Sequence, residues 1–206
     1  MKLYDLARSG NCYKIRLFLS ILGLDYELIP VDANAGELRT PEFLAVNPNG
    51  LVPVLIDGDT TVYDSAAILA YLALTRGAED WFSTEPLRLA RILRWLTFEQ
   101  AEGRYGLARA RAMALSLRTP LAESGTLEES RGIAETALKT LEQRLSEHDW
   151  LAGDGLPTIA DIACYPYTAL IPDAGISLDA YAAIGRWMEA IRGLPGYIPL
   201  PEIANR

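Results

Sequence analysis

Two short stretches of the chain carry residue types that can hold a small charged molecule. Pro53 stands at the start of a β-branched run, where a proline cannot donate to a sheet, so the backbone of Val52 is expected to stay free for a ligand. Asp64 and Ser65 open an apolar helix. Ser65 is expected to be its N-cap, and the free N–H groups of the first turn suit a small carboxylate.

The neighbouring residues predict the elements that position these groups. The sequence Asn-Pro-Asn-Gly at 47–50 is typical of a turn, and the β-branched runs at 54–56 and 60–63 predict two strands. Asp-Gly-Asp at 57–59 joins them as a hairpin, and a helix is expected over 65–76.

These motifs closely resemble the glutathione-binding half of glutathione S-transferases. That family carries Asn-Pro-x-Gly-x-Val-Pro followed by Glu/Asp-Ser-x-Ala-Ile-Leu, and here residues 47–53 read Asn-Pro-Asn-Gly-Leu-Val-Pro and 64–69 read Asp-Ser-Ala-Ala-Ile-Leu. The resemblance implies glutathione as co-substrate, with Pro53 cis and Val52 bonded to its cysteinyl backbone. It also implies that Asp64 and Ser65 hold the γ-glutamyl end, a zwitterion that an acid and a helix start complement.

The first 76 residues are predicted to form one glutathione-binding domain with a thioredoxin-like α/β fold. A strand at 2–6, a helix from 12 to 23 and a strand at 24–31 make a βαβ unit, which is right-handed and parallel. A short helix at 38–46 precedes the hairpin.

Beyond a polar linker, residues 85–206 are predicted to form an all-α domain that binds the second substrate. Apolar periodicity predicts helices at 86–118, 127–147, 158–171 and 180–192. Thr158-Ile159-Ala160-Asp161 has the form of a capping box, which in this family starts a buried helix.

Composition narrows the function classes. The net charge of -8 argues against nucleic acid or an anionic membrane surface as a partner. No apolar run is long enough to span a bilayer, the N-terminus lacks the build of a signal peptide, and there are only two cysteines, so a cytoplasmic location is expected. The single histidine nearly excludes a histidine-ligated metal site, and no metal is expected.

A protein of this kind must lower the thiol pKa of glutathione and hold the thiolate. The predicted loop at 7–11 and the helix start after it supply partial positive charge, and a hydroxyl or amide there can bond the sulfur. A hydrogen bond to a charged acceptor is worth roughly 1.5–3 kcal/mol, which at about 1.4 kcal/mol per pKa unit lowers the thiol pKa by about one to two units. No general base is needed.

Three residues compete for this catalytic role. Ser9 lies three residues before Cys12, which resembles the Ser-x-x-Cys arrangement of theta-like and zeta-like transferases, and it is the favoured donor. Asn11 resembles the asparagine of nu-like transferases with disulfide-reductase activity, as helper or main donor. Cys12 matches the cysteine of beta-like enzymes, although Ser9 replaces their proline, and it also fits a small buried thiol.

The sequence departs from the family at the glycyl end of glutathione. Members often carry a lysine just before Val-Pro, where this chain has Leu51, which leaves Arg39 as the nearby cation. Either glutathione binds more weakly at its glycyl end, or Arg39 makes that contact alone.

The long helix of the second domain carries the candidate pocket for an aromatic or anionic electrophile. Its members share one helix face by their spacing: Trp95, Phe98, Glu102, Tyr105 and Arg109. Core packing is the competing interpretation for Trp95 and Phe98.

The main hypothesis is a cytoplasmic, homodimeric glutathione S-transferase that acts in detoxification, conjugating glutathione to small hydrophobic electrophiles. A glutathione-dependent disulfide reductase or isomerase is the first alternative. A non-catalytic binding module with the same fold is the second.

Overall fold

The chain divides into two units in the computed structural model, which describes residues 1–117, 119–153 and 155–200. The first unit holds Met1–Ala78 and the C-terminal segment that starts at Leu194, and the second holds Glu79–Gly193. The prediction differs in two respects: it ends the first domain at residue 76, and it assigns the segment from Leu194 to the all-α domain of residues 85–206. Residues 194–200 group with the first unit because they pack on the helix α1 (Gly10–Ile21), where the hydroxyl of Tyr13 donates to the carbonyl of Ile198 at 2.5 Å.

The first unit is built on a four-stranded mixed sheet in the order β2-β1-β3-β4. Its strands are β1 (Lys2–Asp5), β2 (Glu27–Pro30), β3 (Val54–Asp57) and β4 (Thr60–Tyr63). β1 and β2 are parallel, as predicted, and the other pairs are antiparallel. The predicted hairpin is confirmed, because Asp57 pairs with Thr60 across a two-residue turn.

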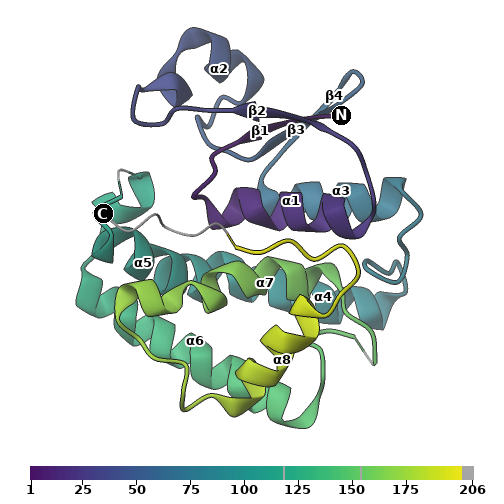
Figure 1. The fold of residues 1–206 in the computed structure, drawn as a ribbon, viewed down its shortest axis with the longest axis vertical. Helices are drawn as coiled ribbons and strands as arrows, with labels where there is room; N and C mark the ends of the chain where they lie inside the picture. The colour runs from purple at the N-terminus through teal and green to yellow at the C-terminus, as the bar shows by residue number, and fades with distance from the viewer. Residues whose placement is uncertain (118, 154, 201–206) are drawn as a thin grey trace. The chain divides into compact units, whose positions relative to one another are not determined.

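Helices cover both faces of this sheet (Figure 1). α1 (Gly10–Ile21) and α3 (Ser65–Thr75) lie side by side on one face, and α2 (Pro41–Val46) lies on the other. The predicted helix at 38–46 is a 3-10 turn, η1 (Glu37–Arg39), followed by α2. The break occurs because Thr40 caps α2 and Pro41 cannot donate to the preceding turn.

Apolar side chains fill both interfaces of the sheet. On the α1 and α3 side, Leu3 and Leu55 pair across β1 and β3 and are fully buried. On the α2 side, Phe43 packs with Val31 and Val54 in a separate cluster.

The strand register gathers three loops at one end of the sheet. Tyr4, near the end of β1, pairs with Val54 at the start of β3, and Val54 pairs with Tyr63 at the end of β4. The loop after β1, the loop before β3 and the start of α3 therefore leave the sheet together. These are the segments that hold the predicted glutathione residues.

The second unit is helical throughout its described elements. In chain order these are α4 (Pro86–Phe98), the π-helix η2 (Glu99–Ala108), α5 (Arg109–Ala114), the 3-10 turn η3 (Pro120–Glu123), α6 (Leu127–Glu147), α7 (Ile159–Ala169), the 3-10 turn η4 (Ile171–Ala174) and α8 (Ala182–Arg192). The predicted helix at 86–118 is thus α4, η2 and α5 in succession, and its expected last residue, 118, lies outside the described residues.

The predicted capping box is confirmed at the start of α7. Thr158 and Asp161 exchange hydrogen bonds with each other's backbone, and Asp161 is 0% exposed. Asp161 also accepts from the backbone N–H of Leu151 at 2.9 Å and from the indole N–H of Trp187 at 3.0 Å. Burial raises the pKa of this carboxyl, against the lowering effect of its hydrogen bonds.

Among the described residues, no helix combines the length and apolar character needed to cross a membrane. Nor, over the same residues, do three or more metal-ligating side chains lie together.

Candidate active site

The loop before β3 is a rigid backbone platform. Asn47 is buried, and its amide nitrogen donates to the carbonyl of Leu51 at 2.7 Å while its amide oxygen accepts from the N–H of Asn49 at 3.0 Å. Gly50 has a φ of 62°, and a Cβ there would lie 2.8 Å from the carbonyl oxygen of Leu38, so only glycine fits. Asn47, predicted as a turn residue and as the first residue of the family motif, therefore also fixes the course of the chain into Val52.

This loop presents the main chain of Val52. The Val52–Pro53 peptide bond is cis, as the family resemblance implies. β3 begins only at Val54, and within the described part of the chain neither the N–H nor the C=O of Val52 makes a backbone hydrogen bond. An extended peptide ligand can therefore pair with Val52 as a further strand would.

The start of α3 differs from the prediction in one respect. Asp64, not Ser65, is the N-cap: its carboxylate accepts from the N–H of Ala66 at 2.9 Å, and Ser65 is the first helical residue. Asp64 has a φ of 76°, a backbone conformation that costs about 1–3 kcal/mol for a residue other than glycine and that clusters at functional sites.

Because Asp64 is the N-cap, the hydroxyl of Ser65 has no capping role. Ser65 is 2% exposed, and its oxygen has no hydrogen-bond partner among the described residues. A buried polar group without a partner is costly, and such groups commonly mark ligand sites. With the free N–H groups at the start of α3, this hydroxyl fits a carboxylate.

The loop after β1 ends at Ser9, which is the N-cap of α1. Its hydroxyl oxygen accepts from the N–H of Cys12 at 3.3 Å. A serine hydroxyl also has one hydrogen to donate, and capping uses only a lone pair. Ser9 can therefore cap α1 and bond a thiolate at the same time.

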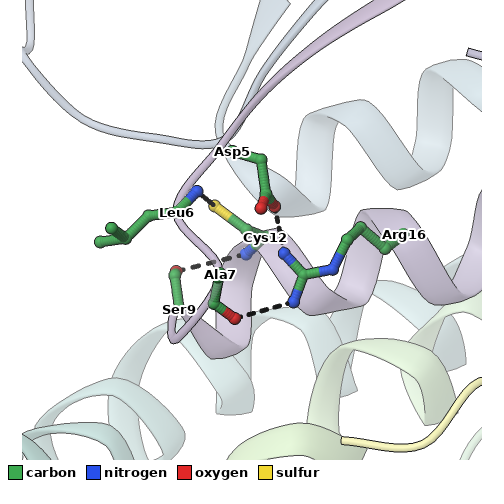
Figure 2. A network of polar contacts seen from close by, with 6 residues as sticks. All are labelled: Asp5, Leu6, Ala7, Ser9, Cys12 and Arg16. Atoms are coloured by element: carbon green, nitrogen blue, oxygen red, sulfur yellow. Dashed lines mark hydrogen bonds and ion pairs between the residues drawn. The ribbon is translucent and has the colours of Figure 1, made fainter. Parts of the chain in front are cut away.

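An ion pair between Asp5 and Arg16 holds this loop (Figure 2). Asp5 closes β1, and Arg16 lies on α1, where its guanidinium also donates to the carbonyl of Ala7 at 3.0 Å. The side chains are only 4% and 12% exposed. Because Arg16 bonds both the strand and the loop, the pair fixes where Ser9 lies, and the sequence analysis did not identify it.

Cys12 lies inside α1 in an environment that disfavours a thiolate. It is fully buried, and its sulfur accepts from the N–H of Leu6 at 3.4 Å. Burial, and secondarily the charge of Asp5, raise the pKa of the Cys12 thiol to about 12. The geometry therefore favours the alternative interpretation of Cys12 as a small buried thiol.

Asn11 lies in the first turn of α1, not in the preceding loop as predicted, because Ser9 starts the helix two residues earlier than expected. Its amide oxygen accepts from the ammonium of Lys14 at 2.8 Å. Lys14 is 0% exposed, and the sequence analysis did not single it out. The available signal was a lysine within the apolar stripe of a helix, three residues after an asparagine.

Arg39 lies at the end of η1 against the loop that leads to Val52. Its side chain is exposed, and its guanidinium donates to the carbonyl of Asn49 at 3.3 Å. A cation thus lies beside the cis-proline loop, where the family resemblance implies a contact with the glycyl carboxylate of glutathione.

In the second unit the predicted pocket residues separate into two groups. Trp95 and Phe98 form an edge-on aromatic pair and are 3% and 8% exposed, so they are core residues. Arg109 is also buried, and its guanidinium donates to the hydroxyl of Ser130 at 2.8 Å, so it stabilises the unit itself. Tyr105 differs, being 45% exposed.

Comparison with known proteins gives two family matches. The model of the glutathione S-transferase N-terminal domain matches residues 1–74, and that of the C-terminal domain matches residues 109–195. The predicted fold class, a thioredoxin-like domain followed by an all-α domain, is confirmed by these matches and by the structural neighbours.

Individual relatives cover nearly the whole chain. The disulfide-bond oxidoreductase YfcG of Escherichia coli is 32% identical over 92% of this chain and 89% of its own. The maleylacetoacetate isomerase of Pseudomonas aeruginosa is 30% identical over 96% and 93%. The crystal structure of a glutathione S-transferase from Pseudomonas fluorescens superposes with a TM-score of 0.88 at 37% identity, covering 98% of both chains. Ure2p in complex with glutathione has a TM-score of 0.82 at 26% identity, over 95% of this chain and 90% of its own.

Proposed function

The chain belongs to the glutathione S-transferase family of enzymes, and we propose that it joins the sulfur of glutathione to small hydrophobic electrophiles. The observation that carries this proposal is the hydroxyl of Ser9. It lies at the N-terminus of a twelve-residue helix and, in the part of the chain that the structure describes, acts only as an acceptor, so its hydrogen is available for a sulfur anion.

Glutathione fits the groups gathered at one end of the sheet. The carboxylate of Asp64 pairs with the γ-glutamyl ammonium, and the hydroxyl of Ser65 donates to the neighbouring carboxylate. The free main chain of Val52 bonds the cysteinyl residue, and Arg39 attracts the glycyl carboxylate. This binding mode supplies a partner for the buried Ser65 oxygen.

The reaction then needs no protein base. The thiol releases its proton to water, and Ser9 and the dipole of α1 stabilise the thiolate. The sulfur lone pair attacks an electrophilic carbon of the second substrate, a C–S bond forms, and the leaving group departs with its electron pair. Tyr105, the exposed aromatic residue of the predicted pocket, is proposed to contact that substrate.

The test combines Ser9→Ala with Ser9→Thr, which keeps a hydroxyl. We expect Ser9→Ala to raise the pKa of bound glutathione by about one to two units and to slow conjugation of a reactive aryl halide about ten- to a hundredfold at neutral pH. Ser9→Thr should largely retain the wild-type thiol pKa and conjugation rate, because it keeps a hydroxyl. Thr126→Ala controls for cap loss, because Thr126 caps α6 in the other unit. A Ser9→Ala variant with unchanged thiol pKa and rate would overturn the assignment.

A second candidate function is glutathione-dependent disulfide reduction. Two observations favour it: the similarity to YfcG over most of the chain, and the position of Asn11 in the first turn of α1, two residues after Ser9. Here the glutathione thiolate attacks one sulfur of the disulfide, so a new S–S bond to glutathione forms, the original S–S bond breaks, and the other substrate sulfur leaves as a thiolate. A second glutathione thiolate then attacks the glutathione sulfur of this mixed disulfide, which releases the remaining substrate thiolate and forms oxidised glutathione. Turnover of a small disulfide well above the best conjugation rate, on one sample, would favour this activity.

The assembly and compartment are also proposals. We propose a homodimer, consistent with the exposed Leu87 and Leu93 of α4, which are 58% and 46% exposed. Light scattering at the monomer mass would refute it. A cytoplasmic location is proposed because both cysteines are free thiols, as in a reducing compartment.

A further inference from the structure

Lys14 is a fully buried lysine whose side chain ends on a residue of the proposed thiolate site. It lies one turn after Asn11 in α1, is 0% exposed, and its ammonium is 2.8 Å from the Asn11 amide oxygen. Lysine is almost never fully buried without such a polar partner. A buried ammonium needs its hydrogen-bond partners, of which Asn11 is one, so this bond constrains the orientation of the amide.

The chemistry of the pair determines which way the amide points. An ammonium has only hydrogens to offer, so the group facing Lys14 must be the oxygen of the amide. The amide nitrogen then points away from Lys14 with both of its hydrogens. Within the described residues this nitrogen makes no hydrogen bond, and Asn11 is partly exposed. A free double donor thus lies two residues from Ser9 at the start of α1.

We propose that Lys14 is a positioning residue that orients the Asn11 amide so that its nitrogen donates to the thiolate of glutathione. Ser9 and Asn11 then bond the sulfur together, one by a hydroxyl and one by an amide. Lys14 does not touch glutathione in this arrangement. The inference rests on the proposed function, because it requires glutathione to bind with its sulfur at the start of α1.

A purely structural role for Lys14 makes a different prediction. In that case its loss would weaken the fold, and any effect on the sulfur would be independent of Asn11. If Lys14 acts through Asn11, its loss matters to the sulfur only while the amide is present. A double-mutant cycle separates the two.

The experiment measures the pKa of the bound glutathione thiol from thiolate ultraviolet absorbance across a pH series. The proteins are wild type, Asn11→Ala, Lys14→Met and the double variant. Asn11→Ala is expected to raise the thiol pKa by about one unit, which is roughly tenfold less thiolate at a fixed pH below it. Lys14→Met should raise it similarly, and the double variant should match Asn11→Ala within about twofold in thiolate fraction.

Two further variants guard against failed folding and test the donor directly. Lys14→Arg keeps a donor-only cation and should keep the thiol pKa near wild type. Asn11→Asp keeps an acceptor for Lys14, so it should fold, but its carboxylate has no hydrogen to donate and should raise the thiol pKa at least as much as alanine does.

The outcomes distinguish this inference from the proposed function. If calorimetry detects no glutathione binding to the wild-type protein, both fail. If glutathione binds with a lowered thiol pKa but the effects of Asn11→Ala and Lys14→Met simply add, only the inference about Lys14 fails. An unchanged thiol pKa in Asn11→Asp overturns it as well.

Discussion

Replacing Arg16 with methionine would leave the carboxylate of Asp5 buried without its cation. The two side chains are 12% and 4% exposed, so water can replace little of the lost interaction. Removing one partner of a buried ion pair costs about 3–5 kcal/mol, and the lost bond to the Ala7 carbonyl adds to the effect. Against a typical total of about 5–15 kcal/mol for a folded domain, that is a large fraction of the free energy of unfolding.

Urea unfolding followed by far-ultraviolet circular dichroism measures this loss. Tryptophan fluorescence does not suit it, because all four tryptophans of the chain lie in the second unit. The matched control is the double variant Asp5→Leu/Arg16→Met, which replaces both charges by apolar groups and should lose less than Arg16→Met alone. If Arg16→Met costs under about 1 kcal/mol, the pair behaves as an exposed one and does not hold the loop of Ser9.

Three further predictions concern other buried features. Ser65→Ala should leave the free energy of unfolding unchanged or raise it, because the buried hydroxyl has no partner to lose among the described residues, yet it should weaken glutathione binding about tenfold in calorimetry; lost stability with unchanged affinity would contradict this. Gly106→Ala should lower the free energy of unfolding by about 1–3 kcal/mol, because its Cβ would lie 2.8 Å from the backbone nitrogen of Ala134. The control Gly132→Ala, in open space on α6, should raise the free energy of unfolding by about 0.5–1 kcal/mol. The reverse order of melting temperatures would refute the close contact at Gly106. The free energy of unfolding should fall as pH rises from about 9 to 12, because burial raises the pKa of Cys12 and the thiolate forms first in the unfolded chain. The dependence of stability on pH should be weaker in Cys12→Ala. Parallel pH profiles for the two proteins would contradict this prediction.

Local chemistry made elements of both units predictable. The hairpin turn at Asp57-Gly58-Asp59 and the capping box of Thr158 and Asp161 depend on residues a few positions apart, so their patterns are visible in the sequence. The N-cap at Asp64 was missed because a positive φ at a residue other than glycine has no local signature.

Contacts between distant segments were not predictable in the same way. Arg109 looked available for a substrate, but Ser130 and the carbonyl of Ser124, brought close by tertiary packing, bind its guanidinium. The ion pair of Asp5 with Arg16 likewise forms only once β1 and α1 pack together. The π-helical course of η2 also has no signature in the apolar periodicity of the sequence.

The two cysteines can report the local opening of each unit separately. Cys12 lies in the first unit and Cys164 in the second, they are the only cysteines in the sequence, and they are 0% and 4% exposed. A thiol reagent reaches each one only when the structure around it opens, so labelling rates read peptide by peptide in a mass spectrometer give two separate opening free energies. The unmodified protein can therefore show whether glutathione protects only the unit that carries Ser65 or both units together.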